Sequence, residues 1–266
     1  MNMSFNVAPK ILTQALEDIQ GKGMYLGDKG FSNSKLTPYV YMELEGNDLT
    51  LWNGDTTCGL KLSLEVEGHR NGSFTGSAET IVPYLKKFSG DSISVAYEDC
   101  LHVGSGHKTA TIPAAVQHPN FDAITRIRQM VKDIEFETVP RTIPDFGSKS
   151  FEGAFQLTSE VFDDAISGCE LVKSGVYLLD YFPPDEEKGL QCALQVDSNN
   201  GTANSFCQSI RPLHGLGEPA TLQYSGPLHK FFKDQPLINF YVKDDFPLLI
   251  VGHSKMAVKA PYTRGD

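Results

Sequence analysis

The chain has 266 residues, of which 40% are hydrophobic and 21% are charged. This length is sufficient for two ordinary domains that each bury a core, and the composition is that of a globular protein. No apolar run approaches the roughly 18 residues of a membrane-spanning helix, and residues 1–5 lack the pattern of a secretory signal. The net charge of −10 counts against nucleic acid as a partner only if that charge is evenly spread.

The cysteines point to a reducing environment. They are odd in number, scattered, and never in a Cys-x-x-Cys pair: Cys58, Cys100, Cys169, Cys192 and Cys207. This spacing favours free thiols in a cytosolic protein over a disulfide framework or a zinc site. We therefore expect no metal and no other cofactor.

The first half of the chain predicts two helices with strands between them. The segment PKILTQALEDI has its apolar residues at helical spacing, which predicts a helix over residues 9–20. Alternating apolar and polar residues predict strands over 39–44, 49–52 and 60–66. The segment ETIVPYLKKF predicts a second helix over 79–88.

The sequence VGSGHKTAT, residues 103–111, has the residue types of a phosphate-binding loop. In that loop two glycines stand five apart and a lysine directly follows the second. Here Lys108 follows His107, and the position five before it is His102. The β-branched run after Lys108 ends at Pro113, as is typical of a strand. The segment therefore predicts a turn between two strands and not a nucleotide site.

The same order returns about 150 residues later. The segment TSEVFDDAISG predicts a helix over 159–168, and PLHKFFK predicts a short one over 227–233. The segment VGHSKMAVKAP, residues 251–261, repeats the valine, glycine, polar turn, lysine and alternating strand of VGSGHKTATIP. Strands are predicted between the helices over 176–182, 190–196 and 205–210. This order favours a duplicated domain over a single large antiparallel sandwich with accidental resemblances.

A connector separates the two halves. It contains a possible helix over 120–132, then an apolar stretch with Pro140 and Pro144 that is expected to run extended over the surface. We therefore predict an α+β protein with an N-terminal domain over 1–116, a connector over 117–149 and a C-terminal domain over 150–266.

These segments resemble the DNA polymerase sliding clamps. The stretch from DLTLWNGDTTCGLKLSLEVEG to GSFTGSAETIVPYLKKFSGDSISVAYEDCLHVGSGHKTATIPA resembles a bacterial β-clamp domain. LHKFFKDQPLINFYVKDDFPLLIVGHSKMAVKAP is similar to the C-terminal part of proliferating cell nuclear antigen. The resemblance covers nearly all of the chain except the connector, which looks longer than the loop usual in the family. The tail after Pro261 also lacks the strongly acidic end of many nuclear-antigen clamps.

The resemblance implies a fold and an assembly. The fold would be the DNA-clamp fold, with two duplicated domains of antiparallel sheets and two short helices in each. Bacterial clamps have three domains and close as dimers, so a two-domain chain needs three copies for a six-domain ring. The subunit interface would pair the last strand of the first half with an edge strand within 202–210. The interface residues are then Lys108, Thr109, Ala110, Thr111, Ile112, Ser205, Phe206 and Cys207.

In the family, paired short helices line a hole that encloses duplex DNA, bound without regard to sequence. The matching lysines here are Lys10, Lys86, Lys87, Lys230 and Lys233. Taken singly, such lysines more often lie on a solvated helix face; their recurrence in both halves favours the channel. The predicted helix over 159–168 carries Glu160, Asp163 and Asp164, so the channel is not expected to be uniformly basic.

The resemblance also implies a pocket for apolar peptides of partner proteins, between the connector and the C-terminal domain. The expected partners are a replicative DNA polymerase, a clamp-loader ATPase and other proteins with clamp-binding motifs. Residues 134–143 would form a lid. The matching residues are Leu60, Ile134, Phe136, Val139, Ile143, Pro247, Leu248, Val258, Ala260 and Pro261. Ordinary core packing is the alternative role of each.

Other classes of function have less support. Cys100 and His102 share a strand face, as a nucleophile and its base would, but no motif or orienting carboxylate accompanies them. We therefore predict a non-enzymatic processivity factor. The alternative is a β-rich ligand-binding or scaffold protein without a DNA role, in which Trp52, Tyr97 and Tyr241 would hold a ligand. The expected location is the cytoplasm, at the nucleoid, or the host cytoplasm if the gene is viral or plasmid-borne.

Overall fold

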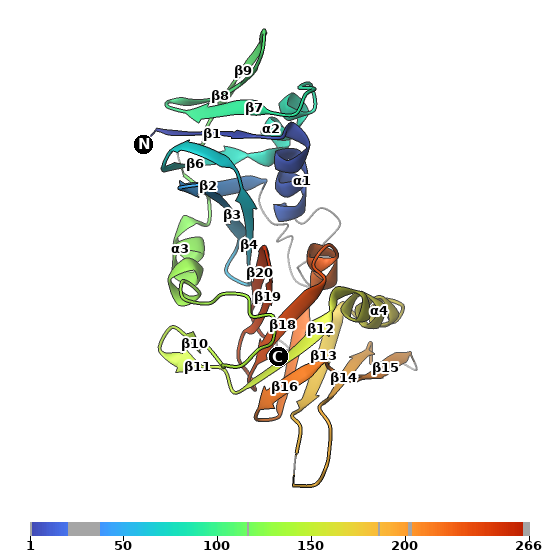
Figure 1. Ribbon diagram of the computed structural model, residues 1–266. Coiled ribbons are helices and arrows are strands. Elements are labelled where there is room, and N and C mark those ends of the chain that lie inside the picture. The colour runs from blue at the N-terminus through green and yellow to red at the C-terminus, as the bar shows by residue number, and fades with distance from the viewer. Residues whose placement is uncertain (1, 21–37, 116, 186, 202–203, 263–266) are drawn as a thin grey trace. The chain divides into compact units, whose positions relative to one another are not determined.

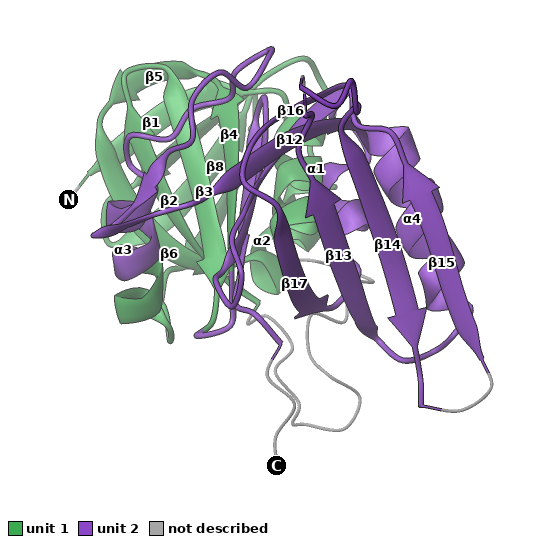
Figure 2. Cartoon of the chain, turned by 90° about the horizontal axis from the view of Figure 1, so that it is seen from below, with its two compact units in different colours: residues 1–23, 36–55, 59–124 green, residues 24–35, 56–58, 125–266 purple. Residues whose placement is uncertain are grey.

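The computed structural model describes residues 2–20, 38–115, 117–185, 187–201 and 204–262. They form two compact units, shown in two colours in Figure 2. The first unit holds the described residues up to Ile124 except Thr56–Cys58, and the second holds Thr56–Cys58 and the described residues from Thr125. The division at 124/125 lies within the predicted connector 117–149.

Each unit is an open series of strands with two helices. In chain order, the first unit contains β1 (Met3–Val7), α1 (Pro9–Ile19), β2 (Tyr39–Glu45), β3 (Asp48–Gly54), β4 (Cys58–Glu65), β5 (Glu67–Arg70), β6 (Gly72–Ser77), α2 (Ala78–Leu85), β7 (Ile93–Tyr97), β8 (Cys100–Ser105) and β9 (Lys108–Pro113). The connector contains α3 (Phe121–Met130), β10 (Asp145–Phe146) and β11 (Lys149–Ser150).

The second unit repeats this series element by element (Figure 1). It contains β12 (Gly153–Thr158), α4 (Ser159–Glu170), β13 (Val176–Phe182), β14 (Ala193–Asn199), β15 (Ser205–Ile210), β16 (His214–Gly217), β17 (Ala220–Ser225), the 3₁₀ helix η1 (Leu228–Phe232), β18 (Leu237–Val242), β19 (Leu248–Gly252) and β20 (Lys255–Lys259).

The strand pairing confirms the duplication. Within the first unit the antiparallel orders are β5-β1-β7-β8-β9 and β6-β2-β3-β4. Within the second they are β16-β12-β18-β19-β20 and β17-β13-β14-β15. Position by position the two units have the same order, so the predicted α+β fold of two duplicated domains is confirmed.

The first helix of each unit follows from its sequence. Pro9 occupies the first turn of α1, where its missing N–H would have no partner anyway. The Thr158 side chain accepts a hydrogen bond from the Val161 N–H and so caps α4. The apolar sides of both helices are buried, with Leu16 of α1 and Phe162 of α4 almost fully enclosed. The predicted helices over 9–20 and 159–168 are thus confirmed.

The second helices differ between the units. The α2 helix is capped by Ser77, whose side chain accepts from the Thr80 N–H, and it ends before the predicted residue 88. The predicted short helix over 227–233 is η1, five residues of 3₁₀ helix. Pro227 precedes η1 and Pro236 follows it, so both ends of this segment are bounded by proline.

Two further observations concern the chain as a whole. No helix within the described ranges is long and apolar enough to cross a membrane. All five cysteines are free thiols in this structure.

Candidate nucleic-acid and partner interfaces

The predicted channel lysines all lie at the surface, near the paired helices of each unit. Lys10 lies in α1 and Lys230 in η1, while Lys86, Lys87 and Lys233 follow directly on α2 and η1. All five side chains are exposed. The structure thus places them where solvent or a ligand can reach them.

One lysine in each unit forms an ion pair between the two helices. Lys86 Nζ lies 2.8 Å from Glu17 Oε1 of α1, and Lys230 Nζ lies 3.1 Å from Glu170 Oε1 of α4. The sequence analysis missed both glutamates. Their signal is visible in hindsight, because each is a carboxylate in the second half of a first helix.

The surfaces of the paired helices are not basic. In the first unit they carry three lysines and three carboxylates at exposed or half-buried positions: Lys10, Lys86, Lys87, Glu17, Asp18 and Glu79. In the second unit they carry two lysines and four carboxylates: Lys230, Lys233, Glu160, Asp163, Asp164 and Glu170. The α4 helix is therefore acidic, as its sequence indicates. Positive charge on these surfaces is confined to single lysines and the Lys86–Lys87 pair.

A histidine is buried beneath the lysines of the second unit. His229 of η1 is 1% exposed, and its Nε2 lies 3.7 Å from Asp163 Oδ1 and 3.9 Å from Glu170 Oε2. Burial lowers the pKa of His229 to about 4, since desolvation of the charged ring outweighs the two carboxylates that would raise it. The ring is therefore neutral at pH 7, and neither nitrogen has a hydrogen-bond partner.

The segment VGSGHKTAT is a strand, a tight turn and a strand, as predicted. The strands β8 and β9 pair from Ser105↔Lys108 outward, and Gly106 has a φ of +57° in the turn. The Lys108 ammonium donates to the Lys87 carbonyl at 3.3 Å. Its position at a hairpin end and not at a helix start excludes the geometry of a phosphate-binding loop.

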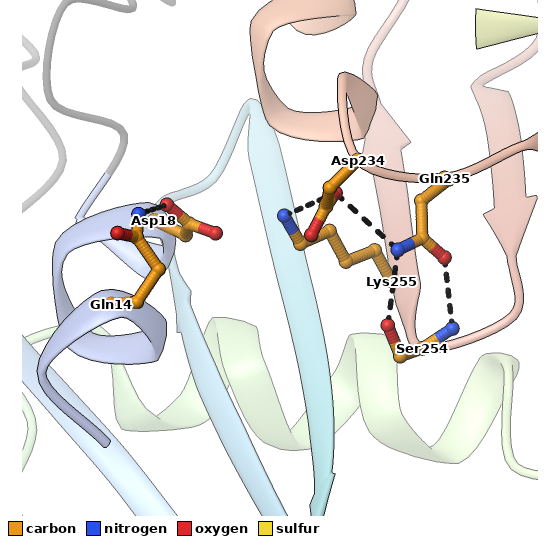
Figure 3. A network of polar contacts seen from close by, with 6 residues as sticks. All are labelled: Gln14, Asp18, Asp234, Gln235, Ser254 and Lys255. Atoms are coloured by element: carbon orange, nitrogen blue, oxygen red, sulfur yellow. Dashed lines mark hydrogen bonds and ion pairs between the residues drawn. The ribbon is translucent and has the colours of Figure 1, made fainter. Parts of the chain in front are cut away.

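The corresponding hairpin of the second unit is held by a polar network (Figure 3). Lys255 is 5% exposed and its Nζ lies 2.7 Å from Asp234 Oδ1, just after η1. Gln235 accepts from the Ser254 N–H at 3.0 Å and donates to Ser254 Oγ at 3.1 Å. The Lys255 ammonium also lies over the Phe231 ring, 5.2 Å from its centroid. These contacts join the hairpin turn to the end of η1.

The predicted interface residues lie on the end strands of two sheets. Lys108 to Ile112 belong to β9, which is last in its five-strand order, and Ser205 to Cys207 belong to β15, last in its four-strand order. Each pairs with a neighbour on one side only within the described residues of its unit. Residues 202 and 203, at the start of the predicted partner segment, lie outside the described residues.

Register decides which backbone groups of β9 are open. Ser105 and Lys108 flank a two-residue turn and so form a hydrogen-bonded pair; alternation makes Gly104↔Thr109 a non-hydrogen-bonded pair. The N–H and C=O of Thr109 therefore point away from β8. Thr111 is in the same position, two residues on.

The predicted peptide pocket is only partly brought together. The pairs Leu249↔Val258 and Leu248↔Lys259 show that Leu248 and Val258 point to opposite faces of the sheet. Leu248 is 0% exposed, and the register places it on the face of Lys255, which meets η1. Leu249, and not Leu248, shares the face of Val258. Leu60 is buried in β4 of the first unit.

The face of Val258 is the one that the connector crosses. Asn239 and Gln156, both buried, donate to the backbone carbonyls of Glu137 at 2.7 Å and Thr138 at 2.8 Å. Asn239 is paired with Val251 in the sheet, and Val251, Leu249 and Val258 share one face. The middle of the connector is thus fastened by two buried amides, which the sequence analysis did not identify.

The remaining pocket residues differ in exposure. Ile134 is buried, at 6% exposed, and so belongs to the core of its unit. The others are half-buried: Phe136, Val139, Ile143, Pro247, Ala260 and Pro261. The Phe136 ring contacts the His253 ring edge-on at 6.2 Å, which ties the connector to the β19–β20 turn.

The thiols offer little nucleophilic chemistry. Burial raises the pKa of Cys169 to about 12, and burial also raises the pKa of Cys192. The pKa of Cys207 is raised by its hydrogen bond with Asp197. His102 Nδ1 is 3.2 Å from Thr111 Oγ1 across the strand pair. Among the described residues no group of three or more histidine, cysteine or acidic side chains is arranged to hold a metal ion.

Two duplicated units, each with paired antiparallel sheets and two short helices, define the DNA sliding-clamp fold, and the chain has this fold. No protein-family model and no curated protein matches the sequence. Solved structures do match. The DNA polymerase III β subunit from Thermotoga maritima superposes with a TM-score of 0.69 at 13% identity, over 99% of this chain and 66% of that one. This chain thus spans about two thirds of that subunit.

PCNA structures match over their whole length. PCNA from A. fulgidus, solved with the C-terminal region of FEN-1 bound, has a TM-score of 0.65 at 13% identity and is covered to 100%. PCNA from Thermococcus kodakaraensis has a TM-score of 0.62 at 12% identity and is also covered to 100%. At identities this low, the superpositions show the fold alone. Function has to be argued from the residues of this chain.

Proposed function

We propose that this protein is a DNA sliding clamp, a ring of three copies that encircles duplex DNA without regard to sequence. The observation that carries the proposal is the pair of open end strands in an otherwise repeated structure. Each chain offers β9 at the end of one sheet and β15 at the end of another. Two units per chain and three copies give six units, and head-to-tail contacts can close into a ring.

The repeat indicates how the strands would meet. Strand β15 holds the place in the second unit that β4 holds in the first. Strand β9 ends the five-strand series of the first unit, as β15 ends the four-strand series of the second. The proposed contact joins these two end strands, β9 of one copy and β15 of the next.

The mass of the purified protein in solution tests the assembly. Light scattering across micromolar concentrations is expected to show a species of three chains, about 88 kDa from the chain mass of 29.3 kDa. Electron microscopy of the same sample is expected to show a central hole. A strict monomer with or without duplex DNA would favour the β-rich scaffold or ligand-binding protein instead.

The exposed lysines supply the proposed contacts with DNA. Phosphate contacts carry no sequence information, and each lowers the slope of log affinity against log salt by about 0.9 on duplex DNA. Changing Lys86, Lys87, Lys230 and Lys233 to alanine should flatten that slope and reduce polymerase processivity. The trimer should persist in this variant. An unchanged slope would remove these residues from the channel.

We further propose that polymerase and other partners bind at the connector. PCNA from A. fulgidus, which shares this fold, holds the C-terminal region of FEN-1. Here the half-buried Phe136, Val139 and Pro261 are apolar side chains that an apolar peptide could still reach. Burying one or two apolar anchors contributes roughly 1.5–3 kcal/mol each. Phe136→Ala is therefore expected to lower the affinity for such a peptide about ten- to a hundredfold while the ring stays intact. Calorimetry measures this affinity.

The remaining parts of the proposal follow from the same role. A closed ring needs a loader ATPase to open it, and no catalytic step by this chain is required. The proposed location is the cytoplasm, with the DNA of the cell or of an infecting element. Fluorescence microscopy of a tagged protein should show foci that depend on ongoing DNA synthesis.

A further inference from the structure

In both units an acidic side chain of the first helix holds a lysine of the second. The Lys86 side chain is 55% exposed and its partner Glu17 is 25% exposed. The Lys230 side chain is 42% exposed and its partner Glu170 is 35% exposed. All four therefore lie where a phosphate could reach the lysine and would also meet the carboxylate.

The two ion pairs use different sequence positions. Glu17 stands eight residues after the first residue of α1, Pro9, whereas Glu170 stands eleven after the first residue of α4, Ser159. Lys86 directly follows an α-helix, α2, whereas Lys230 lies within a 3₁₀ helix, η1. The same kind of contact therefore occurs in both units with different local geometry.

The pairs are poorly suited to stabilising the fold. Exposed ion pairs contribute between about 0 and 1 kcal/mol, because both charges are well solvated and the side chains lose freedom. Each carboxylate, about 3 Å from its lysine, also repels a DNA phosphate that approaches the same lysine. A phosphate that takes the lysine must displace the glutamate and remain close to its negative charge.

We propose that Glu17 and Glu170 compete with DNA phosphate for Lys86 and Lys230, and so keep the hold of the ring on duplex DNA weak. The inference rests on the proposed clamp function. A lysine that exchanges a carboxylate for a phosphate leaves the carboxylate to recruit a cation, so fewer ions are released in total. The pairs thus allow contact with the backbone while reducing both affinity and its dependence on salt.

The surroundings of the second pair act in the same direction. Lys230 and Lys233 lie near His229, whose neutral ring adds no positive charge, while Asp163 adds a negative one. The weakening is expected to be stronger in the second unit, which carries four carboxylates against two lysines.

The test uses the full-length protein and a short, open-ended duplex onto which a ring can thread. Glu17→Gln with Glu170→Gln keeps side-chain size and removes both competing charges. The expected result is about three- to tenfold tighter binding at about 50 mM salt and a slope steeper by about one, for roughly one additional phosphate contact. Fluorescence anisotropy over a salt series measures both.

Two controls separate the competition from net charge. Glu160→Gln with Asp164→Asn removes two charges from the exposed side of α4, and neither carboxylate is ion-paired with a lysine in the described structure. This control should change affinity less than about twofold. In a Lys86→Gln background, Glu17→Gln should lose its effect.

The outcomes distinguish this inference from the proposed function. Suppose that the wild-type ring binds duplex and that the Glu17→Gln, Glu170→Gln variant binds equally well, or no better than the Glu160 and Asp164 control. The proposed competition is then wrong, and the proposed clamp function is unaffected. If neither the wild-type protein nor any variant binds duplex at that low salt concentration, both are wrong. A steeper slope that vanishes in the Lys86→Gln background supports the inference.

Discussion

The β8–β9 and β19–β20 hairpins occupy the same place in the two units and are built from the same motif. In each, the first residue of the last strand is a lysine that reaches back 21 residues to the chain just after the second helix. Lys108 donates to the Lys87 carbonyl, and Lys255 pairs with the Asp234 carboxylate, in both cases at a separation of 21. Both units thus have a contact from this lysine to the residue 21 positions earlier, although the acceptor is a backbone carbonyl in one and a carboxylate in the other.

The two final strands differ in exposure. All five residues of β20 are buried, whereas β9 alternates exposed and covered positions, with only Ile112 buried. An exposed end strand presents unpaired N–H and C=O groups and is a template for pairing with another chain. The residues of β20 are thus covered within the chain, whereas β9 remains open, as the proposed ring requires.

Blocking the open edge of β9 should have the largest effect. Thr109→Pro removes an N–H that points away from β8, so the hairpin keeps its hydrogen bonds and the proposed contact with β15 loses one. A ring of three copies loses one such bond at each of its three contacts, and a bond is worth about 0.5–1.5 kcal/mol. The trimer formation constant should therefore fall by about ten- to a thousandfold, and further through the steric effect of the proline ring. Light scattering at fixed concentration measures the change.

A matched variant makes this result interpretable. Thr109→Val keeps the backbone N–H and a β-branched side chain, so it should assemble as the wild type does. A trimer that survives Thr109→Pro, with the hairpin shown to be intact by circular dichroism, would mean that β9 is not the subunit interface.

Truncating the buried lysine of the other hairpin should be the next largest effect. Lys255→Ala removes a buried aliphatic stem, the contact with Phe231 and the pair with Asp234. Asp234 is 59% exposed and remains hydrated, so the loss is mainly packing. We expect a cost of about 2–3 kcal/mol in the free energy of unfolding, measured by urea denaturation.

Lys255→Met separates packing from charge. Methionine retains most of the stem, so its cost should be about 1 kcal/mol or less. If the two variants were equally destabilised, the ion pair and not the stem would be the main contribution of Lys255.

The order of elements could be predicted from the sequence, because it depends on local patterns. Alternation and helical spacing predicted the strands of residues 176–182 and 205–210 with the bounds that the structure has. The repeat of valine, glycine, turn and lysine identified both hairpins. The likeness between the halves then needed no knowledge of contacts.

Contacts that depend on register or on a second element could not be predicted. Whether Leu248 or Leu249 shares a face with Val258 depends on the register of β19 with β20, and a shift of one position reverses the face. The partners of Lys86 and Lys230 lie 69 and 60 residues away, so no local pattern connects them. The contacts of Gln156 and Asn239 with the connector could not be predicted for the same reason, because their acceptors lie 18 and 102 residues away.

A buried histidine in each unit leads to the next prediction, on pH. Burial lowers the pKa of His229 to about 4 and also lowers that of His118. The folded state thus favours the neutral ring, so the stability is fully present above the unfolded pKa near 6.5 and is lost as pH falls towards 4. For His229 alone the loss between about pH 7.5 and pH 5 is about 2 kcal/mol.

His229→Leu tests this assignment. The variant should lose less stability than the wild type over that pH range, as followed by urea denaturation at about pH 7.5, 6 and 5. Some dependence should remain, because His118 donates to the Tyr39 carbonyl and accepts from the Asn120 N–H, and a second ring proton would displace the latter. An identical pH dependence in the variant and the wild type would exclude His229 as its source.

The smallest effect is expected at the lysine of the first hairpin. Lys108 is exposed and its acceptor is a backbone carbonyl that water can also satisfy, so Lys108→Ala should cost less than about 0.5 kcal/mol. The salt slope of duplex binding should also change little, because the proposed phosphate contacts lie at Lys86, Lys87, Lys230 and Lys233. The comparison with Lys255→Ala is made in the same urea and salt series.

Tight ATP binding abolished by Lys108→Ala would instead restore the phosphate-loop interpretation of VGSGHKTAT and contradict the clamp. Equal destabilisation by the two alanine changes would show that β9 is already covered within the chain, and the contrast between the two hairpins would then have no bearing on assembly.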